Sequence, residues 1–371
     1  MRGSLTLGKI LGIPIKLHSS WFLVAALVTW SLAGSYFPQA YPGWTTTTYW
    51  IVGAATAVLF FTSVLLHELG HSIVALREKV PVRNITLFIF GGVAQIGTEP
   101  RTAGGEFRIA IAGPLTSLLL AGLSSLLSLS VASTAVMTAP LAYLARINLM
   151  LALFNLIPGF PLDGGRVLRA ILWSLGGNFR TATQWASRVG RGVAFLFILG
   201  GMSQMFLGGF LNGLWIVFIG WFINNAAQSS YQQAVLRDML TGLTVRDVMA
   251  QQCITVPGDM RLDRLVADQV LGGGQRCFFV ADGGKVEGLI TLQNIRAVPT
   301  GRRAQLAVSQ VMTPVDAIFL ADSDEDVLTL LQKMDEADVS QVPVTDNGNL
   351  LGMFTRGNLL QYLRLRSELG V

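Results

Sequence analysis

Six apolar stretches fall within the first 227 residues of the 371-residue chain, and each is long enough to cross a membrane. A helix needs roughly 20 apolar residues to span about 30 Å of hydrocarbon. The stretches lie at about 19–37, 49–76, 107–131, 139–161, 189–206 and 209–227. Because hydrocarbon offers no water to an open backbone, we expect each stretch to be a helix. The sequence therefore predicts an integral membrane protein that crosses the bilayer several times.

Composition separates this apolar part from a more polar C-terminal part. Hydrophobic residues make up 51% of the chain and charged residues only 13%, which departs from the usage of soluble domains. Residues 1–227 hold 14 basic and 5 acidic residues (net +9), whereas residues 228–371 hold 13 and 17 (net −4). The basic excess lies in the predicted membrane loops, so we interpret it as topology and expect no nucleic-acid partner.

Basic and uncharged loops alternate along the apolar part. The linkers 38–48, 132–138 and 207–208 contain no Lys or Arg, whereas the loops on the opposite side carry most of the basic residues. Basic loops stay in the cytoplasm during insertion. Both termini and the C-terminal part are therefore predicted to be cytoplasmic.

The second stretch contains ionisable residues, His67-Glu68-Leu69-Gly70-His71, where a membrane helix should hold none. Residues four apart share one face of a helix, so His67 and His71 can bind one divalent metal, and Glu68 can reach a metal-bound water. Ionisable groups in hydrocarbon cost several kcal/mol and are functional by default. This arrangement favours zinc-dependent hydrolysis.

A catalytic zinc site needs a third protein ligand and an open position for water. Three of the remaining acids of the apolar part accompany basic residues in predicted loops: Glu78, Glu99 and Glu106. Asp163 is left, at the cytoplasmic end of the fourth stretch, where Pro158 and Pro161 break helical hydrogen bonding. We expect an unwound helix end that turns Asp163 toward the metal, the alternative being an exposed Asp at an ordinary helix stop. His18 precedes the first stretch and is not assigned as a ligand.

These two motifs together resemble the site-2 protease family of zinc intramembrane proteases. The resemblance rests on His67-Glu68-x-x-His71 and on the later Asn155-x-x-Pro-x-x-Pro-Leu-Asp163-Gly-Gly. It implies that His67, His71 and Asp163 bind one Zn²⁺ ion, that Glu68 is the general base and then the acid, and that Asn155 helps to hold the substrate backbone. It also implies membrane-protein substrates and the plasma membrane of a prokaryote.

Residues 82–97 are rich in β-branched and aromatic residues around Gly91 and Gly92, which predicts two short strands and a turn. The segment is similar to the membrane-embedded hairpin of the same family. A substrate helix that unwinds could pair with a strand edge there, so Gly91 and Gly92 are candidate substrate-binding residues. The alternative is a loop packed against the second stretch.

An internal repeat marks the C-terminal part. Gly288-x-x-Thr291-x-x-Asn294 recurs 64 residues later as Gly352-x-x-Thr355-x-x-Asn358. Each copy is expected to contain a helix, two strands and a helix. The repeat resembles a tandem pair of cystathionine-β-synthase (CBS) domains, which implies binding of ATP, ADP or AMP near Thr291, Asn294, Thr355 and Asn358. Asn replaces the usual Asp in both copies, and a dimerisation module without ligand is the alternative.

The fold class we predict is a polytopic α-helical membrane domain, with about six spans and a membrane-embedded β-hairpin, followed by a soluble α/β tandem CBS domain. The domain limits are 1–227, a linker at 228–242, and 243–371, with repeats at 243–299 and 306–366. The predicted function is zinc-dependent intramembrane proteolysis, modulated by adenine nucleotide. A CBS-regulated ion transporter or channel and a non-catalytic zinc-binding adaptor are the alternatives. The CBS pair could also support a homodimer.

Overall fold

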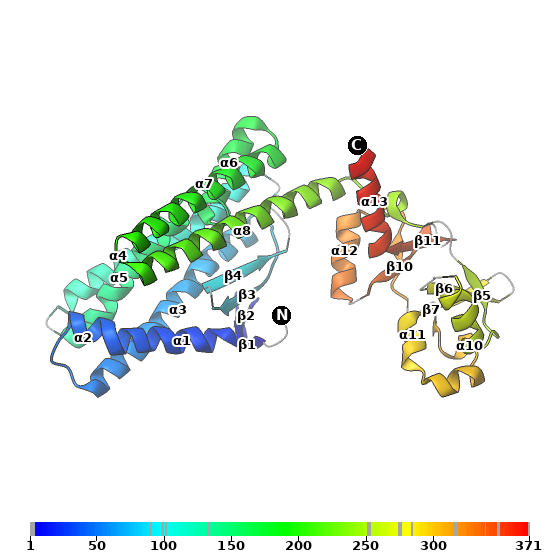
Figure 1. The fold of residues 1–371 in the computed structure, drawn as a ribbon, viewed down its shortest axis with the longest axis horizontal. Helices are drawn as coiled ribbons and strands as arrows, with labels where there is room; N and C mark the ends of the chain where they lie inside the picture. The colour runs from blue at the N-terminus through cyan, green and yellow to red at the C-terminus, as the bar shows by residue number, and fades with distance from the viewer. Residues whose placement is uncertain are drawn as a thin grey trace. The chain divides into compact units, whose positions relative to one another are not determined.

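The computed structural model describes residues 4–89, 91–97, 100, 102–132, 134–250, 254–273, 277–282, 285–314, 318–337, 339–346 and 349–369. It divides into two compact units, Met1–Val235 and Leu236–Val371 (Figure 1). The first unit holds the apolar helices and one sheet, and the second holds two further sheets.

Six helical segments of the described chain are long and apolar enough to cross a membrane, which confirms the number predicted. The first, Ser20–Ala40, is continuous through α1 (Ser20–Ser31), a π-helical turn η1 (Leu32–Tyr36) and α2 (Phe37–Ala40). The others belong to α3 (Thr46–Arg77), α4 (Ala103–Ser130), α5 (Ala135–Asn155), α7 (Phe179–Phe206) and α8 (Phe210–Leu240). The protein is therefore a multi-pass membrane protein.

Helix α5 ends at Asn155, earlier than the apolar stretch from which it was predicted. A separate helix, α6 (Asp163–Gly176), follows a turn that contains Pro158 and Pro161. Asp163 is the first residue of α6, so the expected position on an unwound end of the fourth span was wrong. The two prolines end α5, and the chain then restarts as a helix because Asp163 is well suited to the first turn.

A four-stranded sheet completes the first unit, in the order β1-β2-β3-β4. Its strands are β1 (Ser4–Ile10), β2 (Ile13–His18), β3 (Val82–Phe88) and β4 (Gly91–Ile96). The predicted hairpin is β3–β4, although residue 90 lies outside the described residues, whereas the β1–β2 hairpin was not predicted. Ile13, Ile15 and Ile85 of this sheet pack against Leu69 of α3, which brings the edge strand β4 beside the helix with the His-Glu-x-x-His motif.

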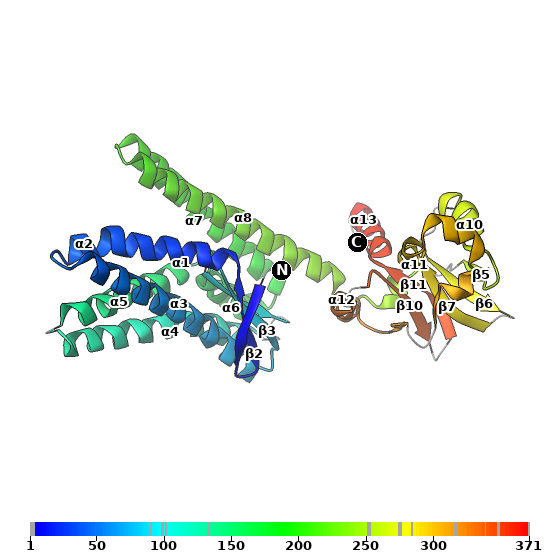
Figure 2. The ribbon, with the colours of Figure 1, turned by 90° about the horizontal axis from the view of Figure 1, so that it is seen from below.

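Helices α7 and α8 lie side by side (Figure 2). Their contact is close because glycines replace larger side chains: a Cβ at Gly201 would lie 2.7 Å from the carbonyl oxygen of Gly213, and one at Gly213 would lie 2.4 Å from that of Gly201. Small residues of this kind let membrane helices approach through their backbones.

The second unit is built from the two repeats. Its helical segments are α9 (Val245–Val248), α10 (Leu262–Arg264), η2 (Leu265–Leu271), α11 (Leu292–Ala297), η3 (Thr300–Gln305), η4 (Val308–Gln310), α12 (Val327–Glu336) and α13 (Arg356–Leu369). Its strands are β5 (Thr255–Pro257), β6 (Cys277–Asp282), β7 (Lys285–Thr291), β8 (Thr313–Pro314), β9 (Ala321–Asp322), β10 (Gln341–Asp346) and β11 (Asn349–Thr355). They form two sheets, ordered β5-β6-β7-β8 and β11-β10-β9.

Each repeat contributes its first segment to the core of the other repeat. Val245, at the start of the first copy, is buried with Val342 and Phe354 of the second. Val308, at the start of the second copy, is buried with Phe278 of the first. The two copies are therefore interleaved, so neither holds a complete core without the other.

Candidate metal centre

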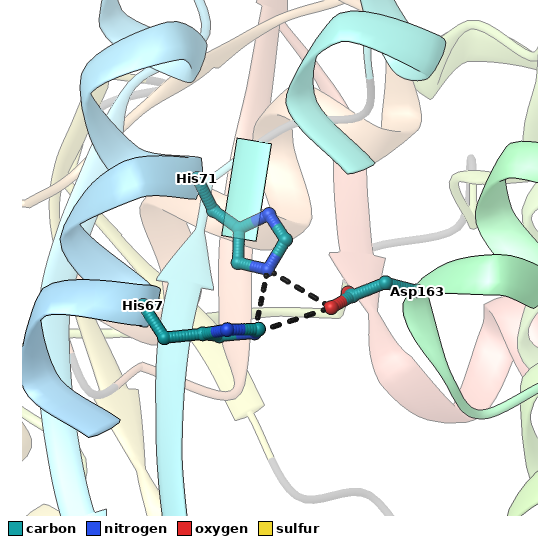
Figure 3. A group of neighbouring side chains, drawn as sticks. All are labelled: His67, His71 and Asp163. Atoms are coloured by element: carbon teal, nitrogen blue, oxygen red, sulfur yellow. Dashed lines mark hydrogen bonds and ion pairs between the residues drawn. The ribbon is translucent and has the colours of Figure 1, made fainter. Parts of the chain in front are cut away.

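Two imidazoles of α3 face the same point inside the first unit (Figure 3). His67 and His71 are four residues apart on the helix, and each residue is 4% exposed. Their Nε2 atoms are 3.3 Å apart. The i, i+4 spacing has therefore placed both nitrogens on one face, as the sequence predicted for metal ligands.

Asp163 approaches the same point from the opposite side, from the first turn of α6 (Figure 3). Its Oδ2 atom lies 3.2 Å from Nε2 of His67 and 3.2 Å from Nε2 of His71. The turn before α6 packs tightly on the helix, since a Cβ at Gly165 would lie 2.3 Å from the backbone of Gly159. Residues almost a hundred positions apart thus form one cluster of donor atoms.

Neighbouring groups on α4 orient both rings. The Nδ1 atom of His71 is 2.7 Å from the carbonyl oxygen of Ile109, so this nitrogen carries the proton that it donates. Its Nε2 is then left with a lone pair. Nδ1 of His67 lies 2.9 Å from the hydroxyl of Ser117. These contacts turn the Nε2 atoms of both rings toward Asp163.

The cluster fits a zinc ion by its chemistry and by its space. Nε2 of His67, Nε2 of His71 and Oδ2 of Asp163 lie within 3.3 Å of one another, so lone pairs on these atoms repel. A divalent cation between the three atoms removes that repulsion. Two imidazoles and one carboxylate are a donor set typical of catalytic zinc. Gly113 of α4 leaves space beside the two imidazoles because it has no side chain. A Cβ at this position would lie 2.1 Å from Nε2 of His71 and 2.7 Å from Nε2 of His67.

Glu68 points from α3 toward the sheet. Its Oε2 atom accepts a hydrogen bond of 3.1 Å from the backbone N–H of Ala94 in β4. A Cβ at Gly92 would lie 2.6 Å from Cγ of Glu68, so β4 can approach the carboxylate only with a glycine there. Gly91 begins the strand with a φ of 118°, a conformation open to glycine. The structure thus brings Glu68, Gly91 and Gly92 to one place beside the donor cluster.

Two other residues considered from the sequence do not belong to the cluster found among the described residues. Asn155 is half-buried at the last position of α5. His18 bonds locally, with Nδ1 2.8 Å from the hydroxyl of Ser20. The donor set is His67, His71 and Asp163.

A buried ion pair was missed in the sequence. Glu106, expected in a basic loop, is fully buried in the first turn of α4, so that expectation was wrong. Its Oε1 accepts hydrogen bonds from Arg169 of α6, including one of 2.7 Å from Nε. Burial is tolerable because the opposite charge is buried with it. Thr102, which caps α4, was the available signal that Glu106 lies inside a helix.

In the second unit, the repeated Thr and Asn side chains cap helices. The hydroxyl of Thr291 donates to Oδ1 of Asn294 at 2.6 Å at the start of α11, and Thr355 and Asn358 repeat the contact at 2.9 Å at α13. Thr291 and Asn294 also line a cavity of about 730 Å³, whose other walls include Ser340 and Gln341 of the second repeat. Thr355 and Asn358 do not line this cavity.

Sequence comparison finds known families in both units. The sequence model of peptidase family M50 matches residues 55–133 and 122–199, and that of the CBS domain matches residues 308–365. Rip3 of Mycobacterium tuberculosis is 36% identical over 368 residues, which cover 98% of this chain and 93% of Rip3. A zinc metalloprotease of Methanocaldococcus jannaschii is 31% identical over 375 residues, 100% of this chain and 99% of the relative.

A solved structure is also similar. The site-2 protease from Methanocaldococcus jannaschii is 31% identical, with a TM-score of 0.42, and the match covers 62% of this chain and 95% of that one.

Proposed function

Because the chain belongs to peptidase family M50, the site-2 proteases, and is a zinc metalloendopeptidase with a CBS domain, we propose that it cleaves membrane proteins in or near a transmembrane segment. The observation that carries the proposal is that the buried His67 and His71 and the half-buried Asp163 converge on one point, with Glu68 next to His67 in the chain. A transporter site has no need of a base beside its ligands, whereas hydrolysis does.

In this proposal His67, His71 and Asp163 hold one zinc ion. When bound, the ion supplies a Lewis acid that polarises a peptide carbonyl and acidifies water at neutral pH. Glu68 takes one proton from the attacking water and later gives a proton to the nitrogen of the leaving amine. Ser117 and Ile109 keep the two rings oriented throughout, since they bond the nitrogens that face away from Asp163.

The substrate segment must be extended at this site, because a regular helix hides its peptide bonds in its own hydrogen bonds. Strand β4 is an edge of its sheet, so its outer backbone groups are open to a further strand. Ala94 already donates to Glu68 from this strand. We propose that the substrate pairs with β4 near Gly91 and Gly92, and that Asn155 helps to hold its backbone.

The variant Glu68→Gln tests the enzyme. Amide and carboxylate have the same shape, so the purified variant should keep its full zinc content. Without the base, cleavage of a co-expressed membrane substrate in detergent should fall by about 100-fold or more. Wild-type cleavage by Glu68→Gln would refute the base assignment, and zinc-free wild-type protein that cleaves normally would refute the metalloprotease mechanism.

We further propose that ATP, ADP or AMP binds in the 730 Å³ cavity of the second unit and modulates cleavage. The volume suits a nucleotide, and pockets of 300–1,000 Å³ are typical of small-molecule sites. Thr291 and Asn294 would face the ligand, while Thr355 and Asn358 would act mainly as caps. Cleavage rates that stay equal with ATP, ADP, AMP and no nucleotide would refute the modulation.

The remaining assignments concern membrane topology, domain limits and oligomeric state. The basic loops support a cytoplasmic position for both termini and for the CBS pair, in a prokaryotic plasma membrane. The repeats support domain limits of 1–227 and 243–371 with a linker between, and a homodimer formed through the CBS pair. Labelling of single cysteines introduced at the two termini, in sealed cells and in lysates, tests the orientation directly.

A further inference from the structure

The ion pair between Glu106 and Arg169 is buried in a membrane domain, where charges are costly. Glu106 is 0% exposed and Arg169 is 6% exposed. The guanidinium donates from both Nε and Nη2 to Oε1 of Glu106, and Nε of Arg166 lies 4.0 Å from the same oxygen. A charge buried inside a protein is costly unless it is paired, so the geometry of this pair is under tight constraint.

Two aromatic rings fix the guanidinium from the sides. Its central carbon is 5.0 Å from the ring centre of Phe160 and 4.5 Å from that of Phe179. Phe160 belongs to the turn before α6, and Phe179 begins α7. Arg169 therefore connects α6 to the turn before it and to the helix after it. Cation–π contacts of this kind are stronger when they are desolvated.

The pair joins the two elements on which the metal centre depends. Asp163 lies six residues before Arg169, roughly 9 Å along α6, and three residues after Phe160. Glu106 lies three residues before Ile109, roughly 4.5 Å along α4, and Ile109 bonds the ring of His71. A shift of α6 relative to α4 would therefore separate Asp163 from the two histidines.

We propose that Glu106 and Arg169 are positioning residues of the metal centre: their ion pair sets the place of α6 on α4 and thereby the distance of Asp163 from His67 and His71. The inference rests on the proposed zinc site. It differs from a general stabilising role, because apolar residues often replace a buried ion pair without loss of stability. Such a replacement would lack the directional hydrogen bonds that fix α6.

A second ion pair provides a matched control. Glu78, just after α3, accepts hydrogen bonds of 2.8 and 3.0 Å from Arg108 of α4. This pair also joins two helices of the first unit, but the side chain of Arg108 is 58% exposed. An exposed pair contributes little to stability. No hydrogen bond or ion pair of the described residues joins it to the turn before α6.

The test uses the full chain in detergent and compares wild type, Arg169→Lys, the double variant Glu106→Met/Arg169→Met, and Glu78→Gln. Zinc affinity is measured by competition with a chromogenic chelator, and the melting temperature is measured on metal-free protein. The double variant should melt within a few degrees of wild type and bind zinc about 10–100-fold more weakly. The zinc affinity of Arg169→Lys should lie between those of wild type and the double variant, since Lys keeps the charge but not the paired N–H donors. Glu78→Gln should match wild type.

A kinetic readout separates positioning from binding of substrate. At saturating zinc the double variant should show a lower kcat with an unchanged KM. Wild-type zinc affinity in a folded double variant would overturn the inference, as would equal losses in Glu78→Gln. If the double variant fails to fold, wild-type zinc affinity in Arg169→Lys would overturn it. Wild-type protein that binds no zinc would instead overturn the proposed function.

Discussion

The motif residues of the two units differ in how far the fold itself accounts for them. In the second unit, Thr291 and Asn294 bond each other and cap α11. In the first unit, the Nε2 atoms of His67 and His71 converge with a carboxylate oxygen of Asp163, and neither imidazole takes part in a described helix cap. Polar side chains that cap a helix are explained by the cap itself. Metal-ligating atoms that face one another at close range inside the protein are explained by a bound ion. The metal centre is therefore the stronger functional site.

Among the substitutions that test this difference between the two units, Gly113→Ala is expected to have the largest effect. The new Cβ would lie 2.1 Å from Nε2 of His71, in the space that the donors share. Zinc affinity should fall by at least about 100-fold, more than loss of an outer contact causes. Gly122→Ala is the control, because it lies in the same helix and its Cβ would meet nothing within 4 Å. Unchanged zinc affinity in Gly113→Ala would mean that the ion binds elsewhere.

Ser117→Ala should have the next largest effect. The hydroxyl is 2.9 Å from Nδ1 of His67, and removing such an orienting group typically weakens a metal site about 10–100-fold. Equilibrium dialysis against a zinc buffer measures the change. Ser128→Ala serves as control, since that hydroxyl is exposed and bonds only its own helix in the described contacts. Equal affinities in both variants would assign Ser117 to helix packing alone.

Gly92→Ala should change catalysis but not zinc binding. Its Cβ would lie 2.6 Å from Cγ of Glu68, so the base must move. We expect kcat to fall about tenfold, a part of what a positioned base contributes, while zinc content stays at the wild-type level. Single-turnover cleavage with metal analysis of the same sample measures both. Loss of zinc together with activity would contradict the separate roles of Glu68 and the three ligands.

The smallest effect concerns the second unit and Asn294→Asp. A carboxylate can still accept from Thr291, so the cap should survive and the melting temperature should shift by no more than about 2 °C. The added charge should raise AMP affinity roughly threefold to tenfold, because charge-assisted hydrogen bonds to ribose hydroxyls are stronger. Calorimetry measures both. Asn358→Asp, which does not line the cavity, should leave AMP binding unchanged. No AMP binding to any variant would favour a dimerisation module.

Much of this architecture was predictable because local patterns define it. The six spans follow from the length of apolar runs, and the β3–β4 hairpin follows from β-branched residues around two glycines. The β1–β2 hairpin was missed because β2 is stabilised by pairing with β3 and by packing on α3, which are long-range contacts. Helix α6 was missed because the two prolines before it read as the end of one helix and not as the approach to another.

The sequence alone determined the chemistry available to this protein: two histidines on one helical face at membrane depth with a glutamate next to the first, an aspartate in a broken segment, and an internal repeat. These follow from helical periodicity and from the cost of charge in hydrocarbon. Only the tertiary structure decided that Asp163 meets the histidines and that Glu106 pairs with Arg169. Such contacts depend on how α4 and α6 pack, and packing between distant segments leaves no periodic signal in the chain.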